Sequence, residues 1–108
     1  MCGVTIDVRV EKGNPVLVNH LEIIEKAIQI EADLHGAAND QQLEMRMTSE
    51  DFAWFAQEVP ACFFRLGTAG SDGSFASGLH TATFDIDERA LVTGTAAMAA
   101  MALGFLAK

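Results

Sequence analysis

Hydrophobic and polar residues alternate strictly over residues 4–10. One face of this segment holds Val4, Ile6, Val8 and Val10, and the other holds Thr5, Asp7 and Arg9. A period of two is typical of a half-solvated β-strand, so the pattern predicts a strand here. Gly13, Asn14 and Pro15 then break the alternation, which predicts a connector or a domain boundary.

The next apolar residues recur with helical spacing. Asn19, followed three residues later by Glu22, has the form of a capping box and predicts a helix that runs to about Leu34. Gly36 is expected to end this helix with a positive φ. Residues 37–42 are polar and predict a loop.

Two further helices are expected. Thr48 and Asp51 predict the start of the first, and Pro60 is expected to end it near Glu58. The side chains expected to face inward from this helix are Phe52, Phe55 and Val59. Asp85 and Glu88 form a third capping signal, which predicts a long helix from Ile86 to about Leu106.

Two short strands are predicted between these helices. Leu43, Met45 and Met47 alternate with charged residues, whereas residues 61–66 form a nearly continuous apolar run that suits a strand in the middle of a sheet. A loop rich in Gly and Ser, residues 67–78, leads to His80. The order is strand, helix, strand, helix, strand, loop and helix, which predicts an α/β fold class.

Composition limits the size of the fold, its partners and its cellular compartment. A chain of 108 residues, half of them hydrophobic, is sufficient for one small folded domain. The formal net charge is −8 and the seven basic residues are scattered, so nucleic acid is excluded as a partner. Cys2 and Cys62 lack the spacing of a disulfide framework. Residues 1–3 lead straight into the strand-like pattern, with neither the basic nor the apolar region typical of a signal peptide. We therefore expect a cytoplasmic protein.

The C-terminal segment is the only one that suggests a membrane. Residues 90–107 carry no charged side chain, but the run is dominated by Ala, Gly and Thr. Such a composition favours transfer into lipid much less than a Leu-rich span does. A buried helix accounts for it better, and no membrane association is expected.

Among the candidate chemical groups, the histidines differ in their settings. His20 and His35 fall at the two ends of the first predicted helix, which favours surface or capping roles. His80 follows a flexible loop and precedes a capped helix, where a scaffold commonly presents a functional group. No ligand spacing surrounds it, so an ordinary loop histidine is the alternative interpretation.

Three other reactive side chains have ordinary explanations. Glu50 and Asp51 stand in the first turn of a predicted helix, where acidic residues are favourable for electrostatic reasons, so we interpret them as capping residues. Cys62 lies within an apolar run and is interpreted as an inert core residue.

Several motifs together resemble the C-terminal region of the di-metal amidohydrolases and peptidases that include aminoacylases, hippurate hydrolases and carboxypeptidases. The motifs are Met-Thr-Ser-Glu-Asp-Phe at 47–52, Val-Pro-Ala-Cys-Phe-Phe-Arg-Leu-Gly at 59–67 and Leu-His-Thr-Ala-Thr-Phe-Asp-Ile-Asp-Glu at 79–88. Thr48 stands where this family often has Gly, and Ala82 where it often has Pro. Both departures bear on the fine geometry of these motifs more than on membership of the family.

The resemblance implies a metal-ligand role for His80. Neutral imidazole suits Zn²⁺, Mn²⁺, Co²⁺ or Ni²⁺. In the family, metal ions activate a water molecule and a carboxylate acts as general base, and the substrates are N-acyl amino acids or small peptides. The base and the other ligands match nothing in this sequence, so no catalytic or substrate-binding residue is assigned.

The resemblance also implies a fold. It is the C-terminal part of a zinc-exopeptidase-like three-layer α/β/α catalytic domain, residues 14–108, preceded by the last strand of a ferredoxin-like lid domain and its connector, residues 1–13. We therefore expect a fragment of a metal-dependent hydrolase that is inactive alone. The alternatives are a non-catalytic module that self-associates through its exposed sheet edges, and a small metal-binding protein that uses His80 with Cys2 or Asp85.

Overall fold

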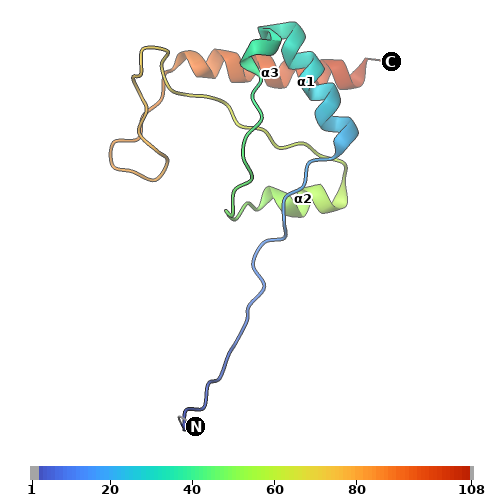
Figure 1. Ribbon diagram of the computed structural model, residues 1–108. Helices are drawn as coiled ribbons and strands as arrows, with labels where there is room; N and C mark the ends of the chain where they lie inside the picture. The colour runs from blue at the N-terminus through green and yellow to red at the C-terminus, as the bar shows by residue number, and fades with distance from the viewer. Residues whose placement is uncertain (1–2, 108) are drawn as a thin grey trace.

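The computed structural model describes residues 3–107. Within this range the chain forms α1 (Leu21–His35), a short 3-10 helix η1 (Ala37–Asn39), α2 (Phe52–Glu58) and α3 (Arg89–Leu106) (Figure 1). Cys2, and with it the metal-site alternative that uses Cys2, lies outside the described residues, as do the first two residues of the predicted 1–13 unit.

Helix α1 ends close to the predicted residue, but its N-terminus is not capped as predicted. It ends at His35, and Gly36 follows with a φ of 89°, as expected from the sequence. The predicted capping box is wrong, because the N-cap residue is His20 and no side chain caps the helix. Asn19 instead uses its side-chain amide to bind the backbone of Phe63. The Asn19 side chain, which the local pattern assigned to the helix N-terminus, thus binds an extended segment that is distant in sequence.

Helix α2 ends at Glu58, two residues before Pro60, as predicted. Its start is organised by Glu50, whose carboxylate accepts a hydrogen bond from the Phe52 N–H at 3.1 Å. The predicted cap from Thr48 is not made. The prediction that Phe55 and Val59 face inward is also wrong, since they are 65% and 57% exposed. The partners that would cover them are absent from the described chain.

Helix α3 begins three residues later than predicted. Asp85 accepts a hydrogen bond from the N–H of Ile86, and Asp87 accepts one from the N–H of Arg89. These local turns hold the acidic segment out of the helix, which begins at Arg89. The C-terminal end, Leu106, agrees with the prediction.

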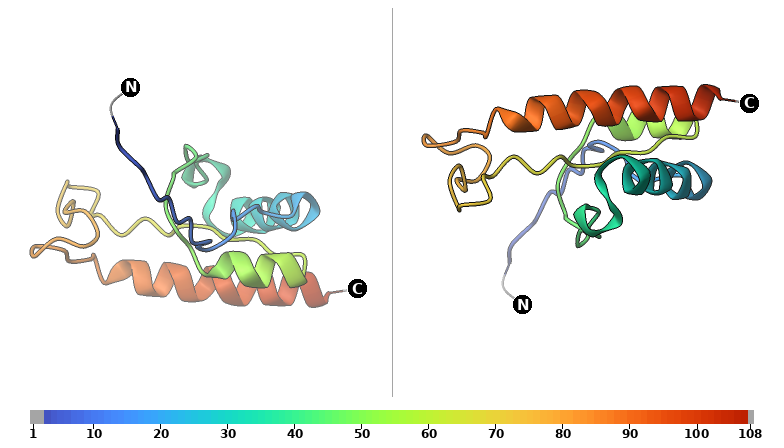
Figure 2. Two further views of the ribbon diagram at one scale, coloured as in Figure 1. Left: turned by 90° about the horizontal axis from the view of Figure 1, so that it is seen from below. Right: turned by 90° about the horizontal axis from the view of Figure 1, so that it is seen from above.

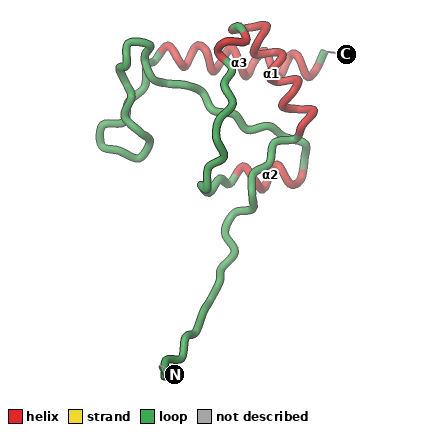
Figure 3. The backbone as a smooth tube through the Cα atoms, viewed as in Figure 1, coloured by secondary structure: helices red, strands yellow, loops and turns green. Residues whose placement is uncertain are grey.

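No β-strand is present among residues 3–107 (Figure 3). The three predicted strands, residues 4–10, 43–47 and 61–66, are irregular segments, and the first extends away from the helices as an arm (Figure 1). A strand is defined by its ladder, and these segments have no neighbouring strand with which to pair. The described architecture is therefore helical, and the α/β class is not confirmed.

The helical body is held mainly by α1 against α3, which lie side by side in both views of Figure 2. Two glycines of α3 allow close approach. A Cβ atom at Gly104 would lie 2.5 Å from Cδ1 of Ile30, and one at Gly94 would lie 2.8 Å from Cδ2 of Leu66. Gly94 and Gly104 thus allow close packing against α3.

The body has almost no core. Its buried hydrophobic residues are Ala27, Ala53, Ala90 and Ala97. The accessible surface is 9432 Å², whereas a folded monomer of this mass exposes about 5,800 Å². The radius of gyration is 19.0 Å, against roughly 13 Å for a compact domain of this length. The described chain therefore exposes much apolar surface that a compact domain of this length would bury.

Helix α3 contributes to this exposed surface. Only 11% of it is buried, so the prediction of a buried helix is wrong for the chain by itself. By length and composition alone α3 could also cross a membrane. The packed part of α3 contacts α1 and, at Gly94, the side chain of Leu66.

Candidate functional site

His80 lies on an exposed turn in the long loop between α2 and α3. Its backbone has a φ of 63°, a left-handed conformation that is uncommon for a residue with a side chain. The hydroxyl of Thr81 donates to the carbonyl of Gly78 at 2.8 Å, and the Phe84 N–H donates to the Thr81 carbonyl. These bonds form a turn that leaves the imidazole accessible to solvent.

The loop is closed at its base. The N–H of Asp87 donates to the carbonyl of Thr68 at 2.9 Å and so joins the two ends of the loop. Within it, the Asp72 carboxylate accepts hydrogen bonds from the hydroxyl and the N–H of Ser74, which lower the pKa of that carboxyl group. His80 is therefore presented by a loop that has its own internal order and is fixed to the start of α3.

The first turn of α3 holds a close ion pair. The guanidinium of Arg89 binds the carboxylate of Asp87 through Nε at 2.9 Å and also through Nη2. These hydrogen bonds, with that from the Arg89 N–H, lower the pKa of Asp87 and raise that of Arg89. The pair satisfies the charge of Arg89, so this end of the loop is a structural joint.

The other histidines have local roles. His20 is the N-cap residue of α1, and its N–H donates to the Ala61 carbonyl at 2.9 Å. His35 lies in the last turn of α1, and its Nδ1 is 2.9 Å from Oε2 of Glu31. These positions agree with the surface and capping roles predicted for both residues.

The described residues do not complete a metal site. No group of three or more His, Cys, Asp or Glu side chains within residues 3–107 is arranged to hold a metal ion. His80 therefore has no set of co-ligands here, and neither His20 nor His35 is brought to it. A single imidazole is too few for the three or more protein ligands usual in zinc sites.

An apolar hollow of about 470 Å³ lies between the helices and residues 60–64. The side chains that line it include Ile23, Phe52, Cys62, Phe64, Met98 and Phe105. Burial raises the pKa of the Cys62 thiol, as expected for an apolar surrounding. The thiol is only half-buried, so Cys62 is less enclosed than the core residue predicted from the sequence.

The sequence did not predict the side-chain contacts of two asparagines, Asn14 and Asn19. Asn14 accepts a hydrogen bond from Nε1 of Trp54 at 3.0 Å and donates one to the hydroxyl of Ser49 at 2.9 Å. It thereby fastens the connector after the arm to the start of α2. Asn19 fastens the next residues to Phe63. Only the position of each asparagine beside a predicted boundary could have suggested such a role.

Known proteins match this chain over nearly its full length. The profile of Peptidase family M20/M25/M40 matches residues 3–104. The chain is 29% identical to the putative amidohydrolase YhaA of Bacillus subtilis over 97% of its length and 26% of the relative. It is 30% identical to thermostable carboxypeptidase 2 of Saccharolobus solfataricus, over 95% of this chain and 26% of that one.

A plant relative also matches nearly the whole chain. IAA-amino acid hydrolase ILR1-like 4 of Arabidopsis thaliana is 28% identical over 98% of this chain and 24% of its own. No solved structure matches. The chain spans about a quarter of the length of these curated relatives.

The matched region defines a segment of a peptidase and amidohydrolase family, as the motifs around Glu50 and His80 indicated. The chain belongs to Peptidase family M20/M25/M40.

Proposed function

We propose that this chain forms the C-terminal part of a metal-dependent hydrolase that cleaves the amide bond of N-acyl amino acids or small peptides. His80 supplies one metal ligand in this proposal. Membership of the M20 family, together with the exposed turn that presents His80, is the observation that carries it. The names of the relatives, a putative amidohydrolase, a carboxypeptidase and an IAA-amino acid hydrolase, support the substrate class.

The role of this chain is to orient the imidazole. The loop is closed by the Asp87–Thr68 hydrogen bond, and the turn at Gly78–Thr81 holds the backbone from which the ring projects. A divalent metal, when bound by the whole enzyme, would supply Lewis acidity at the scissile carbonyl. The described residues lack the co-ligands and a general base near His80. The chain alone should therefore not hydrolyse hippurate.

The exposed apolar surface supports the wider architecture that we propose. Residues 14–108 would form the C-terminal layer of a zinc-exopeptidase-like α/β/α domain, with residues 61–66 as an inner strand. Residues 1–13 would end a lid domain. Cys62 and Phe64 already face α3 across the apolar hollow, as an inner strand covered by a helix would require. Because Cys2 and Cys62 lack the spacing of a disulfide framework, a reducing cytoplasm is the compartment that we propose.

A chimera tests the function. Residues 3–104 of this chain would replace the matching quarter of the Bacillus subtilis YhaA protein. The chimera with the native sequence should bind divalent metal, measured by mass spectrometry, and hydrolyse N-acyl amino acids. The His80→Ala chimera should lose at least one equivalent of metal or most of the activity, since mutation even of a residue that only supports a metal ligand typically costs roughly 10–100-fold in metal affinity or activity.

The matched controls are His20→Ala and His35→Ala, which remove an imidazole without touching the loop. Both should keep the metal content and activity of the parent chimera. If His80→Ala retains full metal content and activity while the chimera is folded, the assignment of His80 is wrong. Hydrolysis of hippurate by the isolated chain would show instead that the site is complete without the rest of the family's sequence.

The second candidate function is a non-catalytic self-associating module. The large exposed apolar surface favours it, because such surface in a soluble protein usually marks an interaction site. A chimera that folds but neither binds metal nor hydrolyses amides would favour this alternative.

A further inference from the structure

Residues 14–20, which we call the entry segment, lead from the arm to the start of α1 and pass beside α2 (Figure 1). Asn14 binds the start of α2 with both polar atoms of its amide. Its Oδ1 accepts a hydrogen bond from Nε1 of Trp54 at 3.0 Å, and its Nδ2 donates one to the hydroxyl of Ser49 at 2.9 Å. Both bonds join residues of this chain, so they require no neighbour from outside it.

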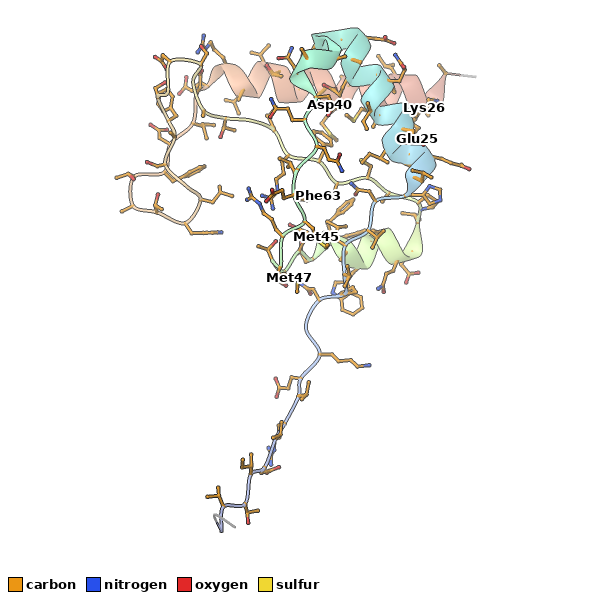
Figure 4. The ribbon with its side chains drawn as sticks, viewed as in Figure 1. Glu25, Lys26, Asp40, Met45, Met47 and Phe63 are labelled. Atoms are coloured by element: carbon orange, nitrogen blue, oxygen red, sulfur yellow. The ribbon has the colours of Figure 1, made fainter. Side chains whose placement is uncertain are left out.

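The other end of the entry segment is held by residues 61–63. Asn19 binds both backbone polar groups of Phe63, and the His20 N–H donates to the Ala61 carbonyl. In the view of Figure 4, Phe63 lies between α2 and α1. Helix α2 ends at Glu58, two residues before this second attachment. The entry segment, α2 and residues 61–63 therefore form a closed frame.

A closed frame resists bending inside it. A bend between Asn14 and Asn19 would break the hydrogen bonds at one end, whereas a bend before Asn14 would break neither set. Gly13 stands directly before the frame, and glycine has the widest range of φ and ψ. Hinges are commonly a few residues at the end of an element that absorb the backbone change. Residues 11–13 meet this description.

We propose that Asn14 is a positioning residue of the hydrolase. It fixes the point at which the lid unit, residues 1–13, joins the catalytic unit. The two units then bend at residues 11–13, and the entry segment moves with α2. This inference rests on the proposed function, which assigns the two units, and it deepens that function.

The contacts of Asn14 lead to a motif of the family. Ser49 belongs to the motif at residues 47–52, and the next residue, Glu50, accepts the N–H of Phe52 at the start of α2. Without the Asn14 amide, the first residues of the entry segment would gain backbone freedom and join the flexible connector. The lid would then occupy its productive position for a smaller fraction of the time, and the apparent affinity for substrate falls with that fraction.

Kinetics of the YhaA chimera test the positioning role. Asn14→Ala removes both hydrogen bonds and should raise KM about 3–10-fold, with kcat within about twofold. Metal content should not change, because the proposed ligand, His80, lies in the catalytic unit. Trp54→Phe removes one donor and keeps an aromatic ring, so it should raise KM by a smaller factor. Adding it to Asn14→Ala should give no further rise, since both changes remove the same bond.

A rescue variant and a control accompany these changes. Asn14→Asp keeps the acceptor for Trp54, and the Ser49 hydroxyl can rotate to donate to it, so KM should stay within about twofold of the parent chimera. Asn39→Ala removes an exposed asparagine hydrogen bond elsewhere in the body, to the His35 carbonyl. Its KM should equal that of the parent.

The attachment of Asn14 also has a readout that needs no activity. Trp54 is the only tryptophan, so its indole N–H gives one assignable signal in the NMR spectrum of the full chain labelled with nitrogen-15. Exchange of this proton with solvent should be at least about threefold slower in the native chain than in Asn14→Ala. Asn39→Ala should exchange at the native rate.

The outcomes separate this inference from the proposed function. Equal indole exchange in the native chain and in Asn14→Ala would overturn the attachment, even in an active chimera. An unchanged KM for Asn14→Ala, an equal rise for Asn39→Ala, or loss of metal from Asn14→Ala would overturn the positioning role. If Asn14→Ala does not fold, an unchanged KM for Trp54→Phe overturns it instead.

A parent chimera that neither binds metal nor hydrolyses N-acyl amino acids would refute the proposed function, and the positioning role with it. Slow indole exchange would then show that the Asn14 contact only supports the fold.

Discussion

The side-chain amide of Asn19 binds both backbone polar groups of Phe63, 44 residues further along the chain. Its Nδ2 donates to the Phe63 carbonyl at 2.9 Å, and its Oδ1 accepts from the Phe63 N–H at 2.7 Å. The amide thus imitates the peptide group of a neighbouring strand. It holds residues 61–63 beside the start of α1, against the apolar hollow.

Replacing this amide should loosen the link between α1 and residues 61–63. Asn19→Ala removes two part-buried hydrogen bonds, each with a net contribution of about 1 kcal/mol, so the free energy of unfolding should fall by about 2 kcal/mol. Urea unfolding followed by circular dichroism measures this change. Asn39→Ala is the control, because it removes one exposed hydrogen bond, to the His35 carbonyl. A loss for Asn19→Ala no larger than for Asn39→Ala would contradict the expected role.

The sequence predicts features of this fold that depend on nearby residues. The end of α1 at Gly36, the end of α2 before Pro60 and the exposure of His80 were all predicted, because backbone conformation and proline geometry are local. The wrong predictions concern groups with distant partners. Asn19 was assigned to a helix cap because nothing near it in sequence reveals Phe63.

The burial of individual side chains could not be predicted either, and the reason is different. Phe55 and the apolar side chains of α3 have core-like spacing, yet they are exposed because hydrophobic periodicity specifies a face without its partner. The same holds for His80. Its motif resembles a ligand motif, but ligand sets are assembled from several parts of a chain, and no such set is gathered among residues 3–107.

Close packing of α3 on α1 can be tested at Gly104. A Cβ there would meet Cδ1 of Ile30 at 2.5 Å and Cγ1 at 3.1 Å, so Gly104→Val should lower the free energy of unfolding by about 1–3 kcal/mol. Ala102→Val, at an exposed position of the same helix, controls for the helix propensity of valine. Adding Ile30→Ala should recover part of the packing loss in a double-mutant cycle. Equal losses at positions 102 and 104 would show that the contact is unimportant.

The thiol of Cys62 should react slowly with alkylating agents. Burial raises its pKa, so less thiolate is present at neutral pH than in the unfolded chain. In a Cys2→Ser background, the midpoint of the pH dependence of iodoacetamide labelling should lie higher for the native chain than for the chain in urea. Because the folded pKa is the higher one, this group's stabilising contribution is complete below the unfolded pKa and is lost as pH rises toward the folded pKa. An unchanged midpoint would contradict the effect of burial.

The start of α3 should depend on the charge of Asp87. Hydrogen bonds from the Arg89 side chain and N–H lower its pKa below the unfolded value. Its contribution to stability is therefore present above the unfolded pKa, about 4, and is lost as pH falls through the folded value. Helicity of the native chain should decrease over this acidic range, and Asp87→Asn should show a smaller decrease from a lower starting value. Asp40→Asn, in the polar loop after η1, is the control and should follow the native curve.

His80 provides the test that separates folding from function. Its φ of 63° costs about 1 kcal/mol or more for a residue with a Cβ, whereas glycine adopts this conformation freely. His80→Gly should therefore leave the free energy of unfolding of this chain unchanged or slightly higher, since the relief of strain offsets the added entropy of the unfolded chain. Ser77→Gly, in the same loop but outside the positive-φ residues, has no strain to relieve and should lose about 0.4–1 kcal/mol. In the YhaA chimera, His80→Gly should lose metal just as His80→Ala does. A strongly destabilised His80→Gly chain would show that the imidazole supports the fold, and the strained backbone would then give no support to a ligand role.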